Sequence, residues 1–414
     1  MSDLGERGWS GDIGREFRVF GVDACVEEPH NSEKEERDMK KSVIFLMAAV
    51  LLLASGAAVS AQEKILFAIA GPMTGDSAAM GIQMRNGATI AVDEINAKGG
   101  VKGKKLEYIV GDDIANPNQA TVVAQKFASD KNILFILGHN NSGCSMSALP
   151  IYEKAGLPVV SPTNTNPTIT SLGHKNYMRV IVDDNAIVEQ QVLLAVKELG
   201  FKKPVVIWEN TDYGKGMRDV AYKKLKELNI PILGDESFVP GVDRDYSAQV
   251  TKFKGTGADV VLFMGEYTAA ALFVKQAKNL GLTAQVVGGS GISNPKLMEV
   301  AGPAAEGVYA LSTFDPNDER PAQAAFIKKY TTRYKDAPGE WSSHSYDIVY
   351  LVKKAYEMGG TDRPSLIKKL HEVKAFPGIT GTIQFDEKGD VSGKNVMVLV
   401  VKGGKFNTYV PKKY

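Results

Sequence analysis

The sequence predicts an α/β fold built from two doubly wound parallel sheets. Short apolar runs typical of buried strands alternate with helical patterns of apolar residues along nearly the whole chain. Most of these runs end in a loop rich in Gly, Ser, Thr or Asn, as parallel strands do where they lead into helices. At 414 residues, with 44% hydrophobic and 23% charged residues, the chain has the length and composition of a globular protein of two domains.

The first series of elements starts at Lys64. Its predicted strands are 64–70, 106–110, 133–137, 157–160 and 177–182. Helical patterns connect them, running through Met84 to Ile95 and stopping at Gly99-Gly100, starting again at Asn116-Pro117, and continuing around Met146 to Tyr152.

A second series follows after Val182. Its predicted strands are 204–208, 259–264, 285–287 and 306–311, and its predicted helices are 217–228 and 269–280. Long amphipathic helices are then expected around Phe326 and Tyr350. No flexible linker separates the two series, so we expect the chain to cross between the two domains more than once.

Two neighbouring strands end in loops that suit an anion. The strand 133–137 leads into Gly138–Ser142, and the strand 157–160 leads into Ser161–Thr165; each loop opens a helix. Free N–H groups and the positive dipole end of a helix favour an anion, and hydroxyl groups can complete its hydrogen bonds. These loops therefore predict a binding site for a small carboxylate that is held without Lys or Arg.

Other loops are expected to share this site. In doubly wound sheets, ligands bind beyond the carboxyl ends of the strands. If the two domains face each other, one cleft is lined by the loops Gly71–Gly75, Gly138–Ser142, Ser161–Thr165, Asn210–Gly214, Gly265–Tyr267 and Gly288–Gly291.

The N-terminal region has the pattern of an export signal. Met39-Lys40-Lys41 is basic, residues 43–54 are apolar, and Val59-Ser60-Ala61 supplies small residues for cleavage. The apolar run falls short of the roughly 18–20 residues that span a membrane. We therefore expect a signal peptide at 39–61 and an exported mature chain from Gln62. Residues 1–38 are then interpreted as an upstream extension from a start codon placed too early.

Several function classes find no support in the composition. The net charge is +1 without a basic stripe, so no nucleic-acid partner is predicted. Cys144 would be the only mature cysteine, because Cys25 precedes the signal peptide; a packing role is favoured over a nucleophile next to His139. No nucleophile–base–acid set, metal cluster or phosphate loop is recognisable. We therefore predict a protein that is not an enzyme and uses no cofactor or metal.

Taken together, the loops closely resemble those of the branched-chain amino acid-binding proteins of bacterial ABC transporters. The resemblance covers Lys64 to Phe406 and is strongest in five motifs: Asp93-Glu94-Ile95-Asn96-Ala97-Lys98-Gly99-Gly100-Val101-Lys102-Gly103, Asp112-Asp113, Gly138-His139, Tyr213-Gly214 and Phe385-Asp386-Glu387-Lys388-Gly389-Asp390.

This resemblance implies a periplasmic protein of the Venus-flytrap type. Its two lobes would close by a hinge motion around the ligand and present it to an inner-membrane ABC permease. Lobe 1 would comprise 62–182 and 313–379, and lobe 2 would comprise 183–312 and 380–414. We expect a monomer.

The resemblance also implies roles for individual residues. Ser142 matches the serine that meets the ligand α-carboxylate, Thr163 a position that offers backbone atoms, and Thr165 the threonine that meets carboxylate and ammonium. Tyr213 and Tyr267 match aromatic residues of lobe 2 that close over the ligand. Trp341 falls near an aromatic residue that lines the side-chain pocket.

Two positions depart from the family pattern in ways that affect the ligand. Ser290 stands where amino acid-binding members typically carry a Glu that pairs with the ligand ammonium, and a buried ammonium without an ionic partner is costly. Glu266 is a candidate for that charge. Otherwise the ligand is an aliphatic or aromatic carboxylate or an amide, or the protein is a periplasmic ligand sensor. Met80 replaces a capping Tyr and predicts a more apolar wall.

The disulfide of a small loop in the family is also missing here. Ala115 and Asn141 occupy the positions of its two cysteines.

Overall fold

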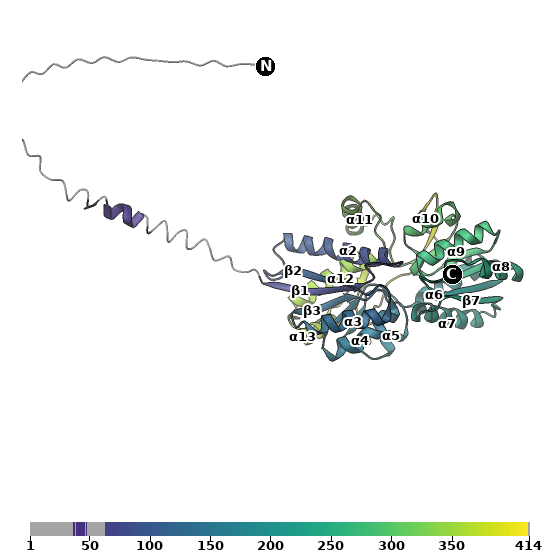
Figure 1. The fold of residues 1–414 in the computed structure, drawn as a ribbon, viewed down its shortest axis with the longest axis horizontal. Helices are drawn as coiled ribbons and strands as arrows, with labels where there is room; N and C mark the ends of the chain where they lie inside the picture. Colours follow the sequence, from purple (N-terminus) through teal and green to yellow (C-terminus); the bar gives the residue numbers. More distant parts are fainter. Residues whose placement is uncertain (1–35, 38, 46, 48–62, 413–414) are drawn as a thin grey trace, which may run out of the picture. The chain divides into compact units, whose positions relative to one another are not determined.

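The computed structural model describes residues 36–37, 39–45, 47 and 63–412 (Figure 1). The chain divides into two units, Met1–Ala61 and Gln62–Tyr414, and the described part of the first is helical. The predicted upstream extension 1–38 and signal peptide 39–61 lie largely outside the described residues. Within the described residues, no helix is long and apolar enough to cross a membrane.

The first lobe of the second unit is built on a five-stranded sheet. Its strands have the order β2-β1-β3-β4-β5 and are all parallel. Their bounds are β1 Lys64–Gly71, β2 Lys105–Asp112, β3 Ile133–Gly138, β4 Val159–Ser161 and β5 Tyr177–Arg179.

Helices cover both faces of this sheet (Figure 1). Successive residues of a strand point to opposite faces, so Phe67 of β1 belongs to one apolar core and Ala68 to another. On the Phe67 face lie α2 (Ala78–Ala97) and α12 (Glu340–Glu357), with α11 (Pro321–Tyr334) against α2 and α13 (Arg363–Glu372) against α12. On the Ala68 face lie α3 (Pro117–Ser129) and α4 (Ser142–Lys154), followed by the short α5 (Thr168–Ser171).

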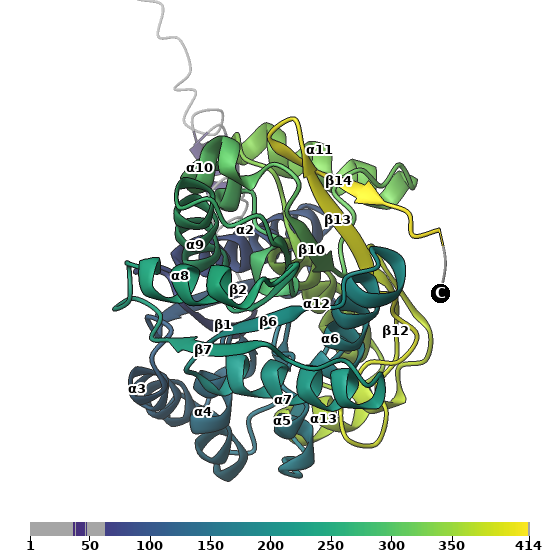
Figure 2. The same cartoon turned by 90° about the vertical axis from the view of Figure 1, so that its right-hand side faces the viewer.

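The second lobe is built on a seven-stranded sheet of order β14-β13-β10-β9-β8-β6-β7. Its strands are β6 Pro204–Glu209, β7 Gly234–Phe238, β8 Val260–Met264, β9 Gln285–Gly288, β10 Tyr309–Ser312, β13 Met397–Lys402 and β14 Lys405–Tyr409. One face carries α6 (Asp184–Leu193) with its π-helical extension Leu194–Glu198, and α7 (Asp212–Glu227). The other carries α8 (Ser247–Thr256), α9 (Tyr267–Asn279) and α10 (Lys296–Ala301), as Figure 2 shows for α7 and α8 on either side of β6 and β7.

The predicted α/β architecture of two parallel sheets covered by helices is confirmed, with one difference. Strands β13 and β14 join the edge of the second sheet as an antiparallel hairpin next to β10. A small antiparallel pair, β11 (Phe376–Gly378) and β12 (Gly381–Ile383), also lies near α12. Predicted helix starts agree with the caps: the side chain of Asn116 accepts N–H bonds from Asn118 and Gln119 at the start of α3.

Between residues 63 and 412 the chain passes between the two sheets three times, at 180–183, 313–320 and 384–396. The second passage leads from β10 to α11 and α12 and so brings the start of α12 to the gap between the lobes. A close approach fixes α12 there: a Cβ at Gly87 of α2 would lie 1.9 Å from the carbonyl oxygen of Ser342. Glycine at this position lets the two helices pack backbone against backbone.

Candidate functional site

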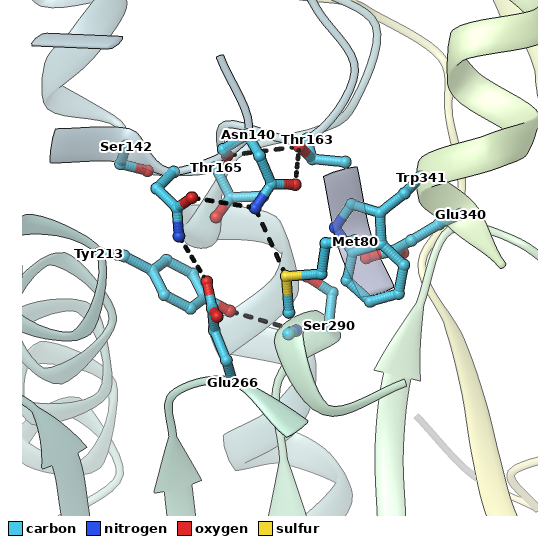
Figure 3. A pocket seen from close by; sticks show the side chains of 12 residues that line it. Met80, Asn140, Ser142, Thr163, Thr165, Tyr213, Glu266, Ser290, Glu340 and Trp341 are labelled. Carbon is cyan, nitrogen blue, oxygen red and sulfur yellow. Dashed lines mark hydrogen bonds between the residues drawn. The ribbon is translucent and has the colours of Figure 1, made fainter. Parts of the chain in front are cut away.

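A cavity lies between the lobes, beyond the carboxyl ends of strands from both sheets (Figure 3). The cavity is small, with a volume of about 30 Å³. The cavity is lined by Met80, Asn140, Asn141, Ser142, Thr163, Thr165, Tyr213, Glu266, Ser290, Gly291, Glu340 and Trp341.

One wall of the cavity is built to meet an anion. Ser142 is the first residue of α4, and Asn141, at the N-cap, makes no capping bond with its side chain. The amide N–H groups of the first helical turn therefore remain available to a ligand. The hydroxyl of Thr165 also lines the cavity; it is buried and close enough to the Asp184 carboxyl to stabilise its charged form. These groups together can bind a carboxylate.

A network of buried hydrogen bonds fixes the loop that leads to Ser142. Nδ1 of His139 lies 2.6 Å from Oδ2 of Asp113, and its Nε2 lies 3.0 Å from the Tyr152 hydroxyl. The side-chain amide of Asn164 donates to the Asn140 carbonyl at 2.6 Å. Because these partners lie in neighbouring strands and helices of the first lobe, the loop is held in place before any ligand binds.

The same network excludes a nucleophilic role for Cys144 with His139 as its base. Both ring nitrogens of His139 are already engaged. Cys144 is fully buried, and burial raises the pKa of its thiol far above the ordinary value, so the thiol stays protonated. The packing role predicted for Cys144 agrees with this placement.

The opposite wall is largely apolar. Trp341, the second residue of α12, and Met80 of α2 are both buried and face the cavity (Figure 3). Nδ2 of Asn140 lies 3.4 Å from Sδ of Met80, and the Thr163 hydroxyl donates to Oδ1 of Asn140 at 3.0 Å. These contacts orient Met80 and Thr163 at the cavity edge.

Tyr213 and Gly291 of the second lobe complete the lining of the cavity near the loop that follows β9. The N–H of Gly291 donates to the hydroxyl of Tyr213 at 3.2 Å. This bond fixes the ring of Tyr213 against the loop that carries Ser290. Burial raises the pKa of the Tyr213 hydroxyl well above its ordinary value, so it remains neutral.

Two carboxylates reach the cavity from different directions. Glu266, at the N-cap of α9, accepts a hydrogen bond from Nδ2 of Asn141 at 2.6 Å and another from the Ser77 hydroxyl. Both donors belong to the first lobe. Burial raises the pKa of Glu266 and that of Glu209, whose Oε2 accepts the Glu266 N–H at 3.2 Å.

Glu340, the first residue of α12, was not singled out from the sequence. It is 2% exposed. Its Oε2 accepts hydrogen bonds from the N–H of Thr313 at 3.2 Å, the hydroxyl of Thr313 at 3.1 Å and the hydroxyl of Ser312 at 3.4 Å. Burial raises the pKa of Glu340 to about 7, and these donors and the Ser290 hydroxyl oppose that rise. Among the described residues that line the cavity, none is basic.

Glu340 also forms part of the wall of a second, larger cavity near the start of α12. This second cavity is mostly apolar, and its lining includes Met298, Phe314, Leu399 and Phe406. The Glu340 side chain thus lies between the two cavities.

The structure brings together eight of the nine predicted site residues in one cavity: Met80, Ser142, Thr163, Thr165, Tyr213, Glu266, Ser290 and Trp341. The ninth, Tyr267, does not line it. Its hydroxyl donates to the carbonyl of Asp76 at 2.8 Å, which is a contact between the lobes beside the cavity. Asn140, Asn141 and Gly291 lie in loops that were predicted to line the cleft, although they were not singled out as site residues. Glu340 was missed; the available signal was its place next to Trp341 after Pro338-Gly339.

Comparisons with known proteins agree with this fold. Residues 64–405 match the family model of a periplasmic binding protein. A Leu/Ile/Val-binding protein homolog of Brucella suis is 34% identical over 89% of this chain and 99% of its own. A leucine-, isoleucine-, valine-, threonine-, and alanine-binding protein of Pseudomonas aeruginosa is 32% identical over 84% of this chain and 92% of its own.

Solved structures give the same result. The substrate-binding protein LivJ of a branched-chain amino acid transporter of Streptococcus pneumoniae, in complex with isoleucine, superposes with a TM-score of 0.78 at 29% identity and covers 83% of this chain and 98% of its own. A leucine-binding protein LivK of Thermotoga maritima gives 0.78 at 29% identity and covers 84% and 98%.

The fold and the interlobe cavity define a two-lobe solute receptor. The chain belongs to the periplasmic binding protein family, and its resemblance to the branched-chain amino acid-binding members is confirmed.

Proposed function

We propose that this protein is the solute-binding component of an ABC importer and that it binds a branched-chain amino acid in the cavity between its lobes. It performs no chemistry on the solute. The mature chain acts in the periplasm as a monomer, after removal of the export signal, and delivers the solute to an inner-membrane permease.

The main support for this proposal is that one small cavity contains groups that favour an anion and other groups that favour a cation. The start of α4 and the hydroxyl of Thr165 favour a carboxylate. Glu266 and Glu340 favour a cation, and no basic side chain lines the cavity among the described residues. A zwitterion such as an α-amino acid matches both preferences, whereas a simple carboxylate would face two acidic side chains and bring a cationic partner for neither.

The uncharged part of the lining supports an apolar ligand side chain. Met80 and Trp341 offer buried apolar surface, and Tyr213 contributes the face of an aromatic ring from the second lobe. Burial of a four-carbon side chain against such surface contributes about 0.8 kcal/mol per CH₂ group. Relatives that match nearly the whole chain are named as binders of leucine, isoleucine and valine.

The proposed lobes give each site residue a role. Lobe 1 (62–182 and 313–379) holds the ligand with Ser142, Thr163, Thr165, Met80 and Trp341. Lobe 2 (183–312 and 380–414) closes over it with Tyr213, Ser290 and the contacts of Glu266 and Tyr267 to lobe 1. The three passages of the chain between the sheets form the hinge.

Isothermal titration calorimetry of the purified protein, unfolded and refolded to remove solute carried over from the cell, tests this function. Leucine, isoleucine and valine should bind at micromolar or lower Kd, and 4-methylpentanoate, which lacks the ammonium, should bind at least 100-fold more weakly. Tighter binding of 4-methylpentanoate or benzoate than of any amino acid would reject the proposal in favour of a carboxylate-uptake protein.

A further inference from the structure

The ligand ammonium needs a buried anionic partner, and the position that usually supplies it does not. Position 290 is a neutral Ser, whereas the resemblance to branched-chain amino acid-binding proteins implies a Glu there. Moving an ammonium out of water without a counter-charge costs several kcal/mol, which would cancel most of the affinity of a small solute. Another residue of this chain must supply the charge.

Glu266 is engaged between the lobes. Its Oε1 accepts a hydrogen bond from the amide of Asn141 and its Oε2 accepts one from the hydroxyl of Ser77. Both donors lie in the first lobe, so the carboxylate of Glu266 connects the two lobes. Turning it toward an ammonium would disturb these interlobe hydrogen bonds, although each oxygen keeps a second lone pair.

Glu340 has the opposite arrangement. The hydrogen bonds from Thr313 and Ser312 all go to Oε2, and they hold the carboxylate in one orientation. Oε1 accepts none of these three bonds, and the side chain is almost completely buried and lines the cavity. Since Glu340 begins α12, the positive end of that helix favours the charged form of the side chain.

Glu340 is also close to Ser290, the neutral residue at the position where the resemblance implies a Glu. Ser290 and Glu340 line the same cavity, and the Ser290 hydroxyl is near enough to stabilise the Glu340 carboxylate. In Figure 3, Glu340 and Trp341 lie on the side of the cavity away from Ser142, so a ligand carboxylate at Ser142 leaves its other polar group free to reach the Glu340 side.

We propose that Glu340 is the residue that binds the ligand ammonium, so that the negative charge of this site comes from the start of α12 instead of the β9 loop. This inference rests on the proposed function, because it assumes an α-amino acid ligand. It assigns to Ser290 the role of a neutral neighbour that supports Glu340, and it assigns to Glu266 the role of an interlobe contact.

Transferring the negative charge from position 340 to position 290 tests the proposal. The affinities of leucine and 4-methylpentanoate are measured by calorimetry for wild type, Glu340→Gln, the double variant Ser290→Glu/Glu340→Gln, and the matched control Glu266→Gln. Glu340→Gln should weaken leucine binding at least 30-fold and leave 4-methylpentanoate unchanged or tighter. The double variant should recover at least tenfold of the lost leucine affinity. Glu266→Gln should weaken both ligands by similar factors.

The outcomes separate this inference from the proposed function. Equal leucine affinity in wild type and Glu340→Gln would overturn the role of Glu340 and leave the amino acid assignment intact. Selective loss of leucine binding in Glu266→Gln would give the role to Glu266. If wild type binds no α-amino acid, both proposals fail. Should Glu340→Gln not fold, Glu340→Asp, which keeps the charge and shortens the side chain, must bind leucine more weakly and 4-methylpentanoate as wild type does.

Discussion

The side chain of Asn141 in the first lobe donates a hydrogen bond to Glu266 in the second, with 2.6 Å between Nδ2 and Oε1 (Figure 3). The contact is reinforced nearby, where the carbonyl of Asp76 accepts hydrogen bonds from Tyr267 at 2.8 Å and Thr268 at 2.9 Å. The closed form is therefore held by direct contacts between the lobes as well as by any ligand between them.

A double-mutant cycle on Asn141 and Glu266 should reveal this contact as coupling in ligand affinity. A hydrogen bond to a charged group is worth about 1.5–3 kcal/mol, so Asn141→Ala and Glu266→Ala should each weaken leucine binding roughly tenfold or more and the pair should be clearly non-additive. Glu299→Ala, which removes a surface carboxylate paired with Lys296, serves as the control and should leave affinity unchanged. Strict additivity of the two variants would contradict a closing role.

The carboxylate wall gives a second prediction. Ser142→Ala together with Thr165→Ala should weaken binding of leucine by several kcal/mol, since each hydroxyl can donate a charge-assisted hydrogen bond of about 1.5–3 kcal/mol. Leucinamide, which lacks the carboxylate, should lose much less affinity in the same variant. Calorimetry measures the affinity of both ligands. An equal loss of affinity for leucine and leucinamide would mean that the ligand carboxylate is bound by other residues.

A third prediction concerns the contact between α2 and α12. Gly87→Ala places a methyl group 1.9 Å from the Ser342 carbonyl oxygen, so the helices must separate. We expect a loss of about 1–3 kcal/mol in unfolding free energy, measured by urea denaturation, and weaker ligand binding because Glu340 and Trp341 move with α12. Gly255→Ala in α8 is the control: its added methyl group meets no atom within 4 Å, and it should be neutral or slightly stabilising.

Asp184 predicts a dependence of stability on pH. It is fully buried, and burial raises its pKa to about 7, although the Thr165 hydroxyl and the charge of Arg179 oppose this rise. A carboxyl whose pKa is raised on folding stabilises the protein below its unfolded pKa of about 4, and this contribution is lost as the pH rises through 7.

Asp184→Asn should abolish the loss of stability that wild type shows as the pH rises through 7. The ligand-free variant should be more stable than wild type by at least about 1 kcal/mol at pH 8, and the difference should disappear near pH 4. Urea denaturation at pH 4, 6 and 8 measures both proteins. A variant that is less stable than wild type at pH 8 would show that the charged form of Asp184 is favoured in the fold.

The sequence predicts most of the fold because its signals are local. Runs such as Ile133–Leu137 are continuous, apolar and short, and each ends at residues that can leave a strand, such as Gly138. The hairpin β13–β14 was not predicted, although the apolar run 396–401 and the turn Gly403-Gly404 are local signals for it; its antiparallel pairing with β10, about 90 positions away, has no local signal. Long-range pairing of this kind depends on the packed lobe.

The candidate site could be predicted only in part, where its residues lie next to strands that have local sequence signals. Ser142, Thr165 and Ser290 follow predicted strands, and their positions at the sheet edge bring them together. Glu340 follows no strand; it reaches the cavity because the chain returns from β10 and Gly87 lets α12 approach α2. Tyr267 follows a strand but starts a helix with its ring turned toward Asp76, which depends on lobe packing.

The position of Glu340 between two cavities links the size of the ligand to its charge. Shortening this side chain would join the central cavity to the apolar space lined by Phe314 and Phe406 and make room for a longer solute. The same change would remove the partner that we assign to the ammonium. Relatives that evolve toward bulkier substrates by this route would therefore become receptors for uncharged or purely acidic compounds unless a carboxylate reappears at position 290.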